Sequence, residues 1–352
     1  MPKQAATADG NADIVVLQYE DLLAGSDLTA EIERAFGYDG MGILTVAGVP
    51  GISDARDRLL PLAHRFAMLP EKTKAKYEHA GSFYAVGWSF GREKLQGRPD
   101  VSKGSYYANP LQDKPFDDAA TIAAHPAFAE PNIWPSEELP ALRGAFMEAG
   151  QLMHRVGCLV AAQCDAFVRA RCDAYPADRL QHVIKTSRCC KGRLLHYFPI
   201  DTAGRECAAS HEASDSAAAQ STDDEFSNWC GWHNDHGSLT ALLPAMYHIT
   251  EPTGEIRQIA CPDADAGLYV RGRQGQLARV VIPASHIGFQ IGETAQIHSG
   301  GLLQATPHAV RGAAASAVSR SSFAVFMEPE WDYPMTVPAD AANAATAATA
   351  AT

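Results

Sequence analysis

The two halves of the chain differ in how hydrophobic and polar residues alternate. In the first half, short apolar runs at 14–17 and 42–46 predict two strands. Longer stretches at 26–36 and 52–67 predict helices, each with a Ser-Asp pair near its start that can cap the helix N-terminus. We therefore expect a mixed α/β region in this part of the chain.

A long helix is predicted from Leu139 to Cys172, because apolar residues recur there at spacings of three, four or seven. Beyond it the pattern changes to short runs punctuated by glycine and proline. The predicted strands are 192–198, 239–243, 267–270, 279–282, 287–291, 302–308 and 322–326. This order favours an α+β protein with a mainly β core, built as a sandwich or jelly roll, over an alternating βαβ sheet.

Composition argues against several classes of partner. The chain has 352 residues, enough for one large domain or two ordinary ones, and a net charge of −12. This acidic balance disfavours nucleic-acid binding and docking on an anionic membrane surface. The chain contains no run of about 18 apolar residues, so no transmembrane helix is predicted. We expect no nucleic acid, no membrane and no obligate protein partner.

Cysteine usage and low-complexity segments add two further expectations. The eight cysteines are scattered and form no CxxC pair, so we interpret them as mostly reduced thiols of a cytoplasmic protein. The N-terminus 1–12, which lacks the apolar core of a secretion signal, and the Ala/Thr-rich tail 336–352 are predicted to be disordered. The small, polar and acidic stretch 201–227 is predicted to be an insertion loop.

The first candidates for chemistry are His233 and Asp235, within the run WHNDHGSLT. Residues i and i+2 of an extended chain project from one face, so an imidazole and a carboxylate can point at a common atom. A third candidate, His308, follows in LLQATPHAV. Two histidines and one carboxylate suit non-haem Fe(II). A surface His-Asp pair and a structural histidine are the alternatives, and zinc also suits this set, although no HExxH-like general base accompanies it.

Arg320 and Ser322, in the run RSSFAVF, share a strand face twelve positions after His308. A guanidinium and a hydroxyl together bind a carboxylate through charge-assisted hydrogen bonds. An arginine in a surface ion pair is the alternative, but the apolar residues that follow favour burial, and a buried arginine needs an anion. The charges of Fe(II), Asp235, the dianion 2-oxoglutarate and Arg320 would sum to zero. A largely dry site tolerates such a neutral set.

In this order, HNDHGSLTALL, LLQATPHAV and RSSFAVF resemble the iron- and 2-oxoglutarate-dependent dioxygenase superfamily, in particular the branch of isopenicillin N synthase and the plant flavonoid and gibberellin oxygenases. The family pattern of HxD, a distal histidine and RxS matches His233, Asp235, His308, Arg320 and Ser322. Further similarity lies in IGFQIGE, LLHYFP, GMGIL and LPEKTK, so the resemblance spans roughly residues 12–335.

The resemblance implies a double-stranded β-helix (jelly roll) flanked by helices. Its parts would be an N-terminal dioxygenase-type region at 13–135, a long backbone helix at 136–180 and a catalytic core at 181–335. His233, Asp235 and His308 are implied to be the catalytic Fe(II) ligands. Arg320 and Ser322 are implied to bind the far carboxylate of 2-oxoglutarate, and Tyr197 sits where relatives place a tyrosine that touches the same carboxylate.

The implied activity is oxidation of a small organic molecule by O2, through hydroxylation or desaturation, with release of succinate and CO2. Ascorbate is a candidate reductant. Two alternatives stay open: an Fe(II) oxidase of the same fold that needs no 2-oxoglutarate, with Arg320 and Ser322 holding the substrate's own carboxylate, and a catalytically inactive binding module.

The sequence departs from the family pattern at Gln290, where the family often has Asn, and at His298, where it often has an aromatic residue. We interpret His298 as a structural strand histidine. We interpret His236, next to Asp235, as a supporting residue and not a ligand. Three aromatic residues are further pocket candidates, with core packing as the alternative for each: Tyr106, Tyr107 and Phe326.

Overall fold

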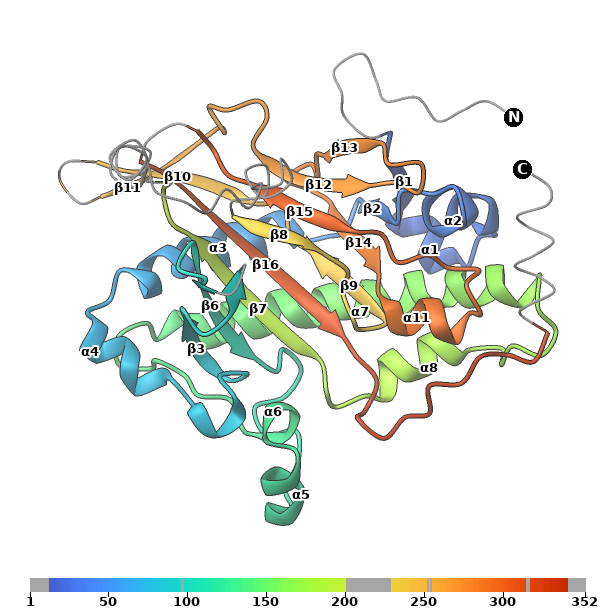
Figure 1. The fold of residues 1–352 in the computed structure, drawn as a ribbon, viewed down its shortest axis with the longest axis horizontal. Helices are drawn as coiled ribbons and strands as arrows, with labels where there is room; N and C mark the ends of the chain where they lie inside the picture. Colours follow the sequence, from blue (N-terminus) through green and yellow to red (C-terminus); the bar gives the residue numbers. More distant parts are fainter. Residues whose placement is uncertain are drawn as a thin grey trace, which may run out of the picture.

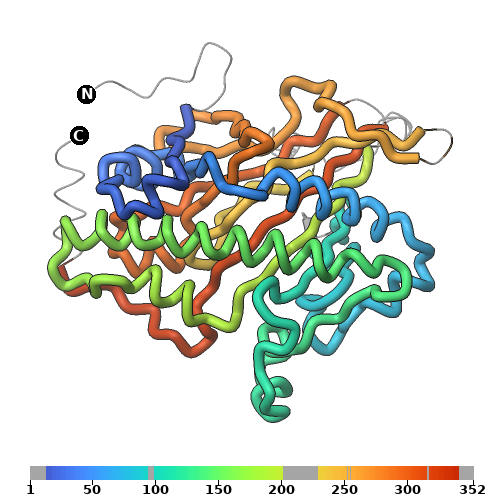
Figure 2. Tube along the Cα trace, turned by 180° about the vertical axis from the view of Figure 1, so that it is seen from behind, coloured from blue at the N-terminus to red at the C-terminus, as the bar shows by residue number. Residues whose placement is uncertain are grey.

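The computed structural model describes residues 13–95, 98–200, 229–251, 253, 255–314 and 317–340. The predicted disordered N-terminus 1–12, the insertion loop 201–227 and residues 341–352 of the predicted tail lie outside the described residues. Within the described part, two β-sheets face each other and helices cover the outer face of the larger sheet (Figures 1 and 2). The predicted fold class, a jelly-roll β core flanked by helices, is therefore confirmed.

The larger sheet contains ten strands, most of them antiparallel. Eight follow one another in the order β1 (Val15–Gln18), β2 (Ile43–Ala47), β14 (Ile287–Ile291), β9 (Leu239–Leu242), β16 (Val318–Met327), β7 (Lys191–Tyr197), β6 (Lys103–Ala108) and β3 (Gly87–Phe90). The other two form a hairpin, β10 (Met246–Thr250) and β11 (Ile256–Ile259), in which β10 pairs with the first half of β16. The long strand β16 is thus the centre of the sheet.

The smaller sheet has the order β13 (Leu277–Val280), β12 (Gly267–Arg271), β15 (His308–Arg311) and β8 (Cys230–His233). A separate short ribbon pairs β4 (Lys94–Leu95) with β5 (Arg98–Pro99). Side chains from both larger sheets line one cavity between them. Alternation along each strand therefore decides which residues face the cavity and which face the core.

Most of the longer helices lie behind the larger sheet, as the view from that side shows (Figure 2). They are α1 (Tyr19–Ala24), α2 (Thr29–Phe36), α3 (Ile52–Ala67), α4 (Glu71–Lys74), α5 (Ala119–Ala124), α6 (Pro126–Ala129), α7 (Ala141–Arg169), α8 (Arg179–Thr186) and α11 (Glu293–His298). Two short 3-10 turns follow α4, at Ala75–Tyr77 and Ala80–Ser82. Among the described residues, every helix is too short or too polar to span a lipid bilayer.

The helix α7 packs directly on the back of the larger sheet because Gly157 leaves room for a close approach. A Cβ at this position would lie 2.4 Å from the Met327 Cε atom of β16. The buried side of α7 carries the apolar residues that its sequence spacing predicted, among them Leu142, Phe146 and Met153. This packing fixes the outer face of β16 and leaves its inner face free for the cavity.

Two local predictions were wrong. The predicted strand 302–308 is irregular up to Pro307, and β15 begins only at His308. Proline has no backbone N–H for a ladder, and upstream the Gln304 N–H donates to the Phe36 carbonyl at the end of α2 instead. His298, expected on a strand, lies in the last turn of α11, with Nε2 3.2 Å from the Pro334 carbonyl oxygen.

Candidate metal centre and co-substrate site

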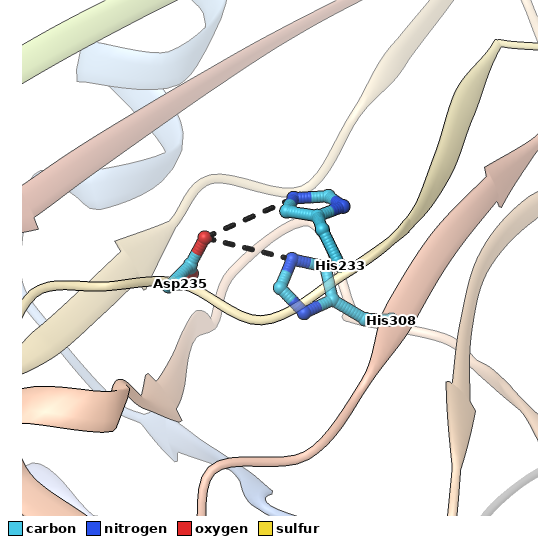
Figure 3. A group of neighbouring side chains, drawn as sticks. All are labelled: His233, Asp235 and His308. Atoms are coloured by element: carbon cyan, nitrogen blue, oxygen red, sulfur yellow. Dashed lines mark ion pairs between the residues drawn. The ribbon is translucent and has the colours of Figure 1, made fainter. Parts of the chain in front are cut away.

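Three side chains from the smaller sheet and its following loop converge on one point. β8 and β15 are neighbours, and His233 lies directly opposite His308 in the ladder. The Asp235 Oδ1 atom is 3.9 Å from His233 Nε2 and 3.7 Å from His308 Nε2 (Figure 3). One ligand atom from each of these residues lies within 4.8 Å of the others. The arrangement is compatible with a single cation bound by two imidazoles and one carboxylate.

Each imidazole is oriented by the backbone two residues before it. His233 Nδ1 lies 2.7 Å from the Gly231 carbonyl oxygen, and His308 Nδ1 lies 3.4 Å from the Thr306 carbonyl oxygen. A ring nitrogen that faces a carbonyl oxygen must carry a proton, so in the neutral form of each ring Nε2 presents a lone pair. Both lone pairs are therefore available to a metal ion on the side of Asp235.

The two histidines differ in their protonation behaviour. Burial lowers the pKa of His308, against the attraction of the Asp235 carboxylate, which favours the neutral ring that a metal needs. At His233, burial also disfavours the cation, but the nearby Cys230 sulfur, the Gly231 carbonyl and Asp235 outweigh it and raise the pKa to about 9. A divalent cation at Nε2 competes with this proton, so metal binding would release it.

The loop that carries Asp235 is held by the N-terminus of α11. The Glu293 N–H donates to the Asp235 carbonyl oxygen at 2.8 Å, and the Thr294 hydroxyl donates to the His236 carbonyl oxygen at 2.7 Å. At Gly292 a Cβ would lie 2.0 Å from the Gly237 carbonyl oxygen, so only glycine allows this contact. The helix therefore fixes the backbone on both sides of the carboxylate.

Glu293 also holds the side chains that flank Asp235. Its carboxylate accepts a hydrogen bond from Asn234 Nδ2 at 3.1 Å and lies 2.7 Å from His236 Nδ1. The His236 side chain is 90% exposed, so it points away from the metal site and supports the loop from the surface. No local pattern in the sequence marks Glu293 as a site residue. Its only signal was its place at the end of IGFQIGE, and the contact depends on a helix that the pattern did not predict.

Arg320, Ser322 and Tyr197 form a second polar group on the larger sheet. Arg320 and Ser322 alternate along β16, and Tyr197 on β7 is the register partner of Arg320. The Arg320 guanidinium lies over the Tyr197 ring, 4.9 Å from its centroid, and Arg320 Nη1 is 3.4 Å from the Ser322 hydroxyl. Burial raises the pKa of Tyr197, so its phenol keeps its proton.

Arg320 is buried and lacks a counter-charge. Its exposed fraction is 7%, and its Nε has no hydrogen-bond partner. In the described part of the chain no carboxylate lies within ion-pair distance of it. A buried guanidinium without an anion is costly, so the site is incomplete until an anionic group binds beside Arg320.

Both groups face one cavity of about 1060 Å³, including its open mouth. The six predicted site residues line it: Tyr197, His233, Asp235, His308, Arg320 and Ser322. Of the three aromatic candidates, Phe326 lines the cavity too. Tyr106 and Tyr107 do not, because the Tyr106 hydroxyl donates to the Ile133 carbonyl oxygen and the Tyr107 hydroxyl donates to Glu93 at 2.9 Å.

About the first third of the chain matches a known family model. Residues 13–137 match the family described as the N-terminal region of the non-haem dioxygenases of morphine synthesis. No curated protein matches the chain in sequence.

Solved structures share the fold across nearly the whole chain. T7H of Neurospora crassa, solved with alpha-KG and 5-formyluracil, is 18% identical with a TM-score of 0.62, over 94% of this chain and 88% of its own. JOX2, solved with 2OG, Fe and JA, is 16% identical with a TM-score of 0.59, over 97% and 83%. The rice dioxygenase for auxin oxidation is 18% identical with a TM-score of 0.53, over 94% and 87%.

Proposed function

We propose that the chain is a non-haem Fe(II)- and 2-oxoglutarate-dependent dioxygenase that oxidises a small organic molecule, as the match of its first third to a dioxygenase family model and its fold support. One observation carries this proposal. A His-Asp-His ligand set and a buried arginine without a counter-charge face the same cavity. A metal site alone would also suit a hydrolase, but a metal site combined with a receptor for a carboxylate suits a chelating diacid.

The residues fit this pair of ligands. His233, Asp235 and His308 would hold Fe(II), and they leave its remaining positions open to the cavity. When Fe(II), 2-oxoglutarate and O2 are bound, the centre supplies an oxidant strong enough to break an unactivated C–H bond, with succinate and CO2 as products. Arg320 and Ser322 would bind the far carboxylate of the co-substrate, and the Tyr197 hydroxyl would donate to it.

The rest of the cavity shields the buried members of the site from water, whereas the His233 side chain is 42% exposed. Its walls are largely aliphatic, with Leu195, Leu242, Val310 and Ala324 among the lining residues. In such surroundings each electrostatic contact is stronger than in water. The fixed charges also balance, since Arg320 and the metal together neutralise Asp235 and a dianionic co-substrate. The protein would therefore contribute by orienting the reacting groups and by limiting their contact with water.

The substrate is proposed only as a small molecule that fits this cavity. T7H was solved with 5-formyluracil or thymine, and JOX2 was solved with JA. These ligands support a small organic substrate for the present chain without selecting among them. Hydroxylation and desaturation would both begin with the removal of a hydrogen atom from the substrate, so the proposal includes both reactions.

Succinate formation from 2-oxoglutarate tests the proposal. The purified full-length protein, loaded with Fe(II) under nitrogen, is supplied with 2-oxoglutarate, ascorbate and pooled metabolites, and succinate is measured after air is admitted. We expect succinate from the wild type, and at least a 100-fold loss in His233→Ala and Asp235→Ala with unchanged circular dichroism. His182→Ala, an exposed histidine on α8, is the matched control and should keep full activity.

Three outcomes would contradict the proposal. Oxygen uptake that is independent of 2-oxoglutarate would favour the oxidase of the same fold, with Arg320 and Ser322 holding the substrate's own carboxylate. Failure to bind Fe(II) in an anaerobic titration would favour the inactive binding module. Normal turnover in Asp235→Ala would show that the ligand assignment is wrong.

A further inference from the structure

The cavity contains a pair of buried polar side chains without partners. Thr240 on β9 and Gln290 on β14 are direct register partners, and both line the cavity. Their exposed fractions are 1% and 2%. The Thr240 hydroxyl and both polar atoms of the Gln290 amide have no hydrogen-bond partner in the described residues. Buried groups of this kind are costly to leave unpaired, so a ligand is expected to pair them.

The register of the sheet separates this pair from Arg320. Thr240 is the partner of Phe326 on β16, and Phe326 lies six residues beyond Arg320. Six residues of a strand span about 20 Å. A five-carbon diacid whose far carboxylate is bound by Arg320 is shorter than this span, so the pair is left for a second molecule.

The pair lies at the Asp235 end of the cavity. Gln290 precedes Gly292 by two residues, and the Gly292 N–H donates to the Ser238 carbonyl oxygen at 3.2 Å. A Cβ on Gly292 would lie 3.0 Å from the Asp235 carbonyl oxygen. The pair is therefore close to the loop that carries a metal ligand. A molecule held by the pair would have its remaining atoms beside the metal site, where an oxidised substrate must lie.

The side chains beside the pair are apolar. Ile43 is the other register partner of Gln290, and Phe326 is the other register partner of Thr240. The next residue of this row, Lys191, lies beyond Phe326, donates to a backbone carbonyl and does not line the cavity. A charged group of a ligand would therefore find no counter-charge beside the pair. The charges of the loaded site also sum to zero already, so the pair is suited to a neutral polar group.

We propose that Thr240 and Gln290 are specificity-determining residues that bind a neutral amide of the oxidised substrate, with its N–H and C=O on one edge, as in a lactam or a cyclic imide. This inference rests on the proposed function. The Gln290 oxygen accepts from the N–H and the Gln290 NH2 group donates to the C=O, so the side chain matches such an edge with two hydrogen bonds. The Thr240 hydroxyl donates to the second lone pair of the same carbonyl oxygen. A carboxylate offers no donor to the Gln290 oxygen, and a protonated amine offers no acceptor to its NH2 group.

Three six-membered rings test the chemistry of this edge. 2-Piperidone carries the N–H and the C=O, cyclohexanone keeps only the C=O, and cyclohexanecarboxylate carries a charge. Each is titrated anaerobically into the full-length protein, loaded with Fe(II) and saturated with 2-oxoglutarate so that Arg320 is occupied. Binding near the paramagnetic Fe(II) is measured by the faster nuclear magnetic relaxation of the ring protons of the probe. The protein loaded with diamagnetic Zn(II) gives the background.

The variants are Gln290→Met and Thr240→Val, which keep side-chain volume and remove the polar atoms. Gln258→Met, at an exposed glutamine on β11 outside the cavity lining, is the matched control. Anaerobic titration of 2-oxoglutarate, followed by the visible charge-transfer absorption of a chelated 2-oxo acid, shows whether each variant keeps its metal and co-substrate sites. Thermal melts show whether each variant is folded.

We expect the wild type and Gln258→Met to bind 2-piperidone about ten-fold more tightly than either of the other rings. Gln290→Met should bind 2-piperidone and cyclohexanone within about two-fold of each other, because both hydrogen bonds that distinguish the lactam are lost. Thr240→Val should weaken the lactam by about three-fold, since one hydrogen bond to a shared acceptor is lost. Both cavity variants should bind 2-oxoglutarate within about two-fold of the wild type. Neither should melt at a lower temperature than the wild type, because each removes polar atoms that are unpartnered in the protein alone.

Equal binding of the three rings by the wild type would overturn the inference, because water would then satisfy the pair. Tighter binding of the carboxylate than of the lactam would also overturn it, since the pair would then not select a neutral group. Cavity variants that keep the preference for the lactam, or that weaken 2-oxoglutarate as much as the lactam, would show that the pair does not bind the substrate. Failure of the proposed function appears in the wild type itself, as Fe(II) binding without 2-oxoglutarate binding, and this inference fails with it. The two failures are distinguishable, because failure of the inference alone leaves 2-oxoglutarate binding by the wild type intact.

Discussion

Both faces of β7 and β16 carry buried polar side chains, but the two faces accommodate these side chains in different ways. On the cavity face lie Tyr197, Arg320 and Ser322, and on the opposite face lie His196 and Ser321. Because side chains alternate along a strand, the two groups are separated only by the thickness of the sheet. They have similar neighbours in sequence, so the difference between them reflects chemistry and not position in the chain.

The outer face stays neutral, although His64 Nδ1 and His196 Nε2 have no hydrogen-bond partner in the described residues. His196 Nδ1 and His248 Nε2 lie 3.3 Å and 3.2 Å from the Ser321 hydroxyl, and the ring of His64 from α3 packs 4.9 Å from that of His196. Burial lowers the pKa of His196 to about 3 and that of His248 to about 4. The cluster therefore avoids a buried charge by staying neutral, and the nearby Arg56 donates to the backbone carbonyls of Pro244 and Ala245.

The cavity face cannot do the same. A guanidinium does not lose its proton in a protein, and Arg320 finds no carboxylate in the described part of the chain. Structural and functional burial can be told apart in this sheet. A buried group that can neutralise itself or find a partner is structural, whereas one that can do neither, beside a cavity, indicates a ligand.

The largest test of this comparison is Arg320→Met. We expect 2-oxoglutarate affinity to fall by about 100-fold, because the far carboxylate loses its charged partner. The protein without co-substrate should unfold at the same temperature or higher, because an uncompensated buried charge has been removed. Anaerobic titration and thermal melts measure the two effects. Arg257→Met, on the exposed hairpin strand β11, should change neither.

A melting temperature that falls by many degrees in Arg320→Met would contradict the comparison. It would mean that Arg320 stabilises the fold by itself and is satisfied without a ligand. Affinity within two-fold of the wild type would show that the co-substrate carboxylate binds elsewhere.

A smaller effect is expected at Glu293, which supports the metal site without touching the ligand atoms. Glu293→Ala removes the contacts to Asn234 and His236 and should lower Mn(II) affinity by about ten-fold, since groups that orient metal ligands typically have effects of this size. Glu293→Gln keeps an acceptor oxygen and should recover part of the loss. Equilibrium dialysis measures both variants.

The control for Glu293 is Glu330→Ala, which breaks a surface ion pair with Arg188 away from the site. Equal metal affinity in Glu293→Ala and Glu330→Ala would mean that the backbone contacts of α11 hold Asp235 without help from the side chain.

Local patterns in the sequence singled out His233, Asp235, His308, Arg320 and Ser322, which line one cavity in the structure. His233 and Asp235, and likewise Arg320 and Ser322, are two apart, and that spacing alone places each pair on one strand face. His308 was singled out although the strand predicted around it was wrong. Its position depends on pairing with β8 across the ladder, which no local pattern contains.

Gln290 was noted only as a departure from the family pattern, and Thr240 was not singled out, because single polar residues in apolar strands are common. They meet only because β9 and β14 pair, although fifty residues separate them in the chain. The strands β3 and β6 were missed for a similar reason, since they gain their stability from pairing with the centre of the sheet. In this protein, chemistry that depends on charge was visible in the sequence, and chemistry that depends on an unpaired neutral group required the tertiary structure.

The smallest effect concerns the outer face and is a change of stability with pH. Unfolded histidines bind protons below about pH 6.5, whereas His248 and His196 stay neutral in the folded protein down to about pH 4 and about pH 3. The unfolded state therefore binds more protons as the pH falls, and the free energy of unfolding decreases by up to about 1.4 kcal/mol per pH unit for each histidine. We expect urea unfolding to show this loss between pH 6.5 and pH 5.

His248→Gln removes one of these titrating groups, so it isolates the contribution of His248 to the change of stability with pH. At pH 7 the variant should be less stable than the wild type, because the contact between the His248 ring and the Ser321 hydroxyl is lost. As the pH falls to 5, the difference should shrink by about 2 kcal/mol, because only the wild type pays for keeping this ring neutral. His182→Gln, on the exposed side of α8, should keep the wild-type slope. A constant difference between His248→Gln and the wild type across this range would mean that His248 accepts a proton in the folded protein. The outer face would then tolerate charge as the cavity face does, and the contrast between the two faces would not hold.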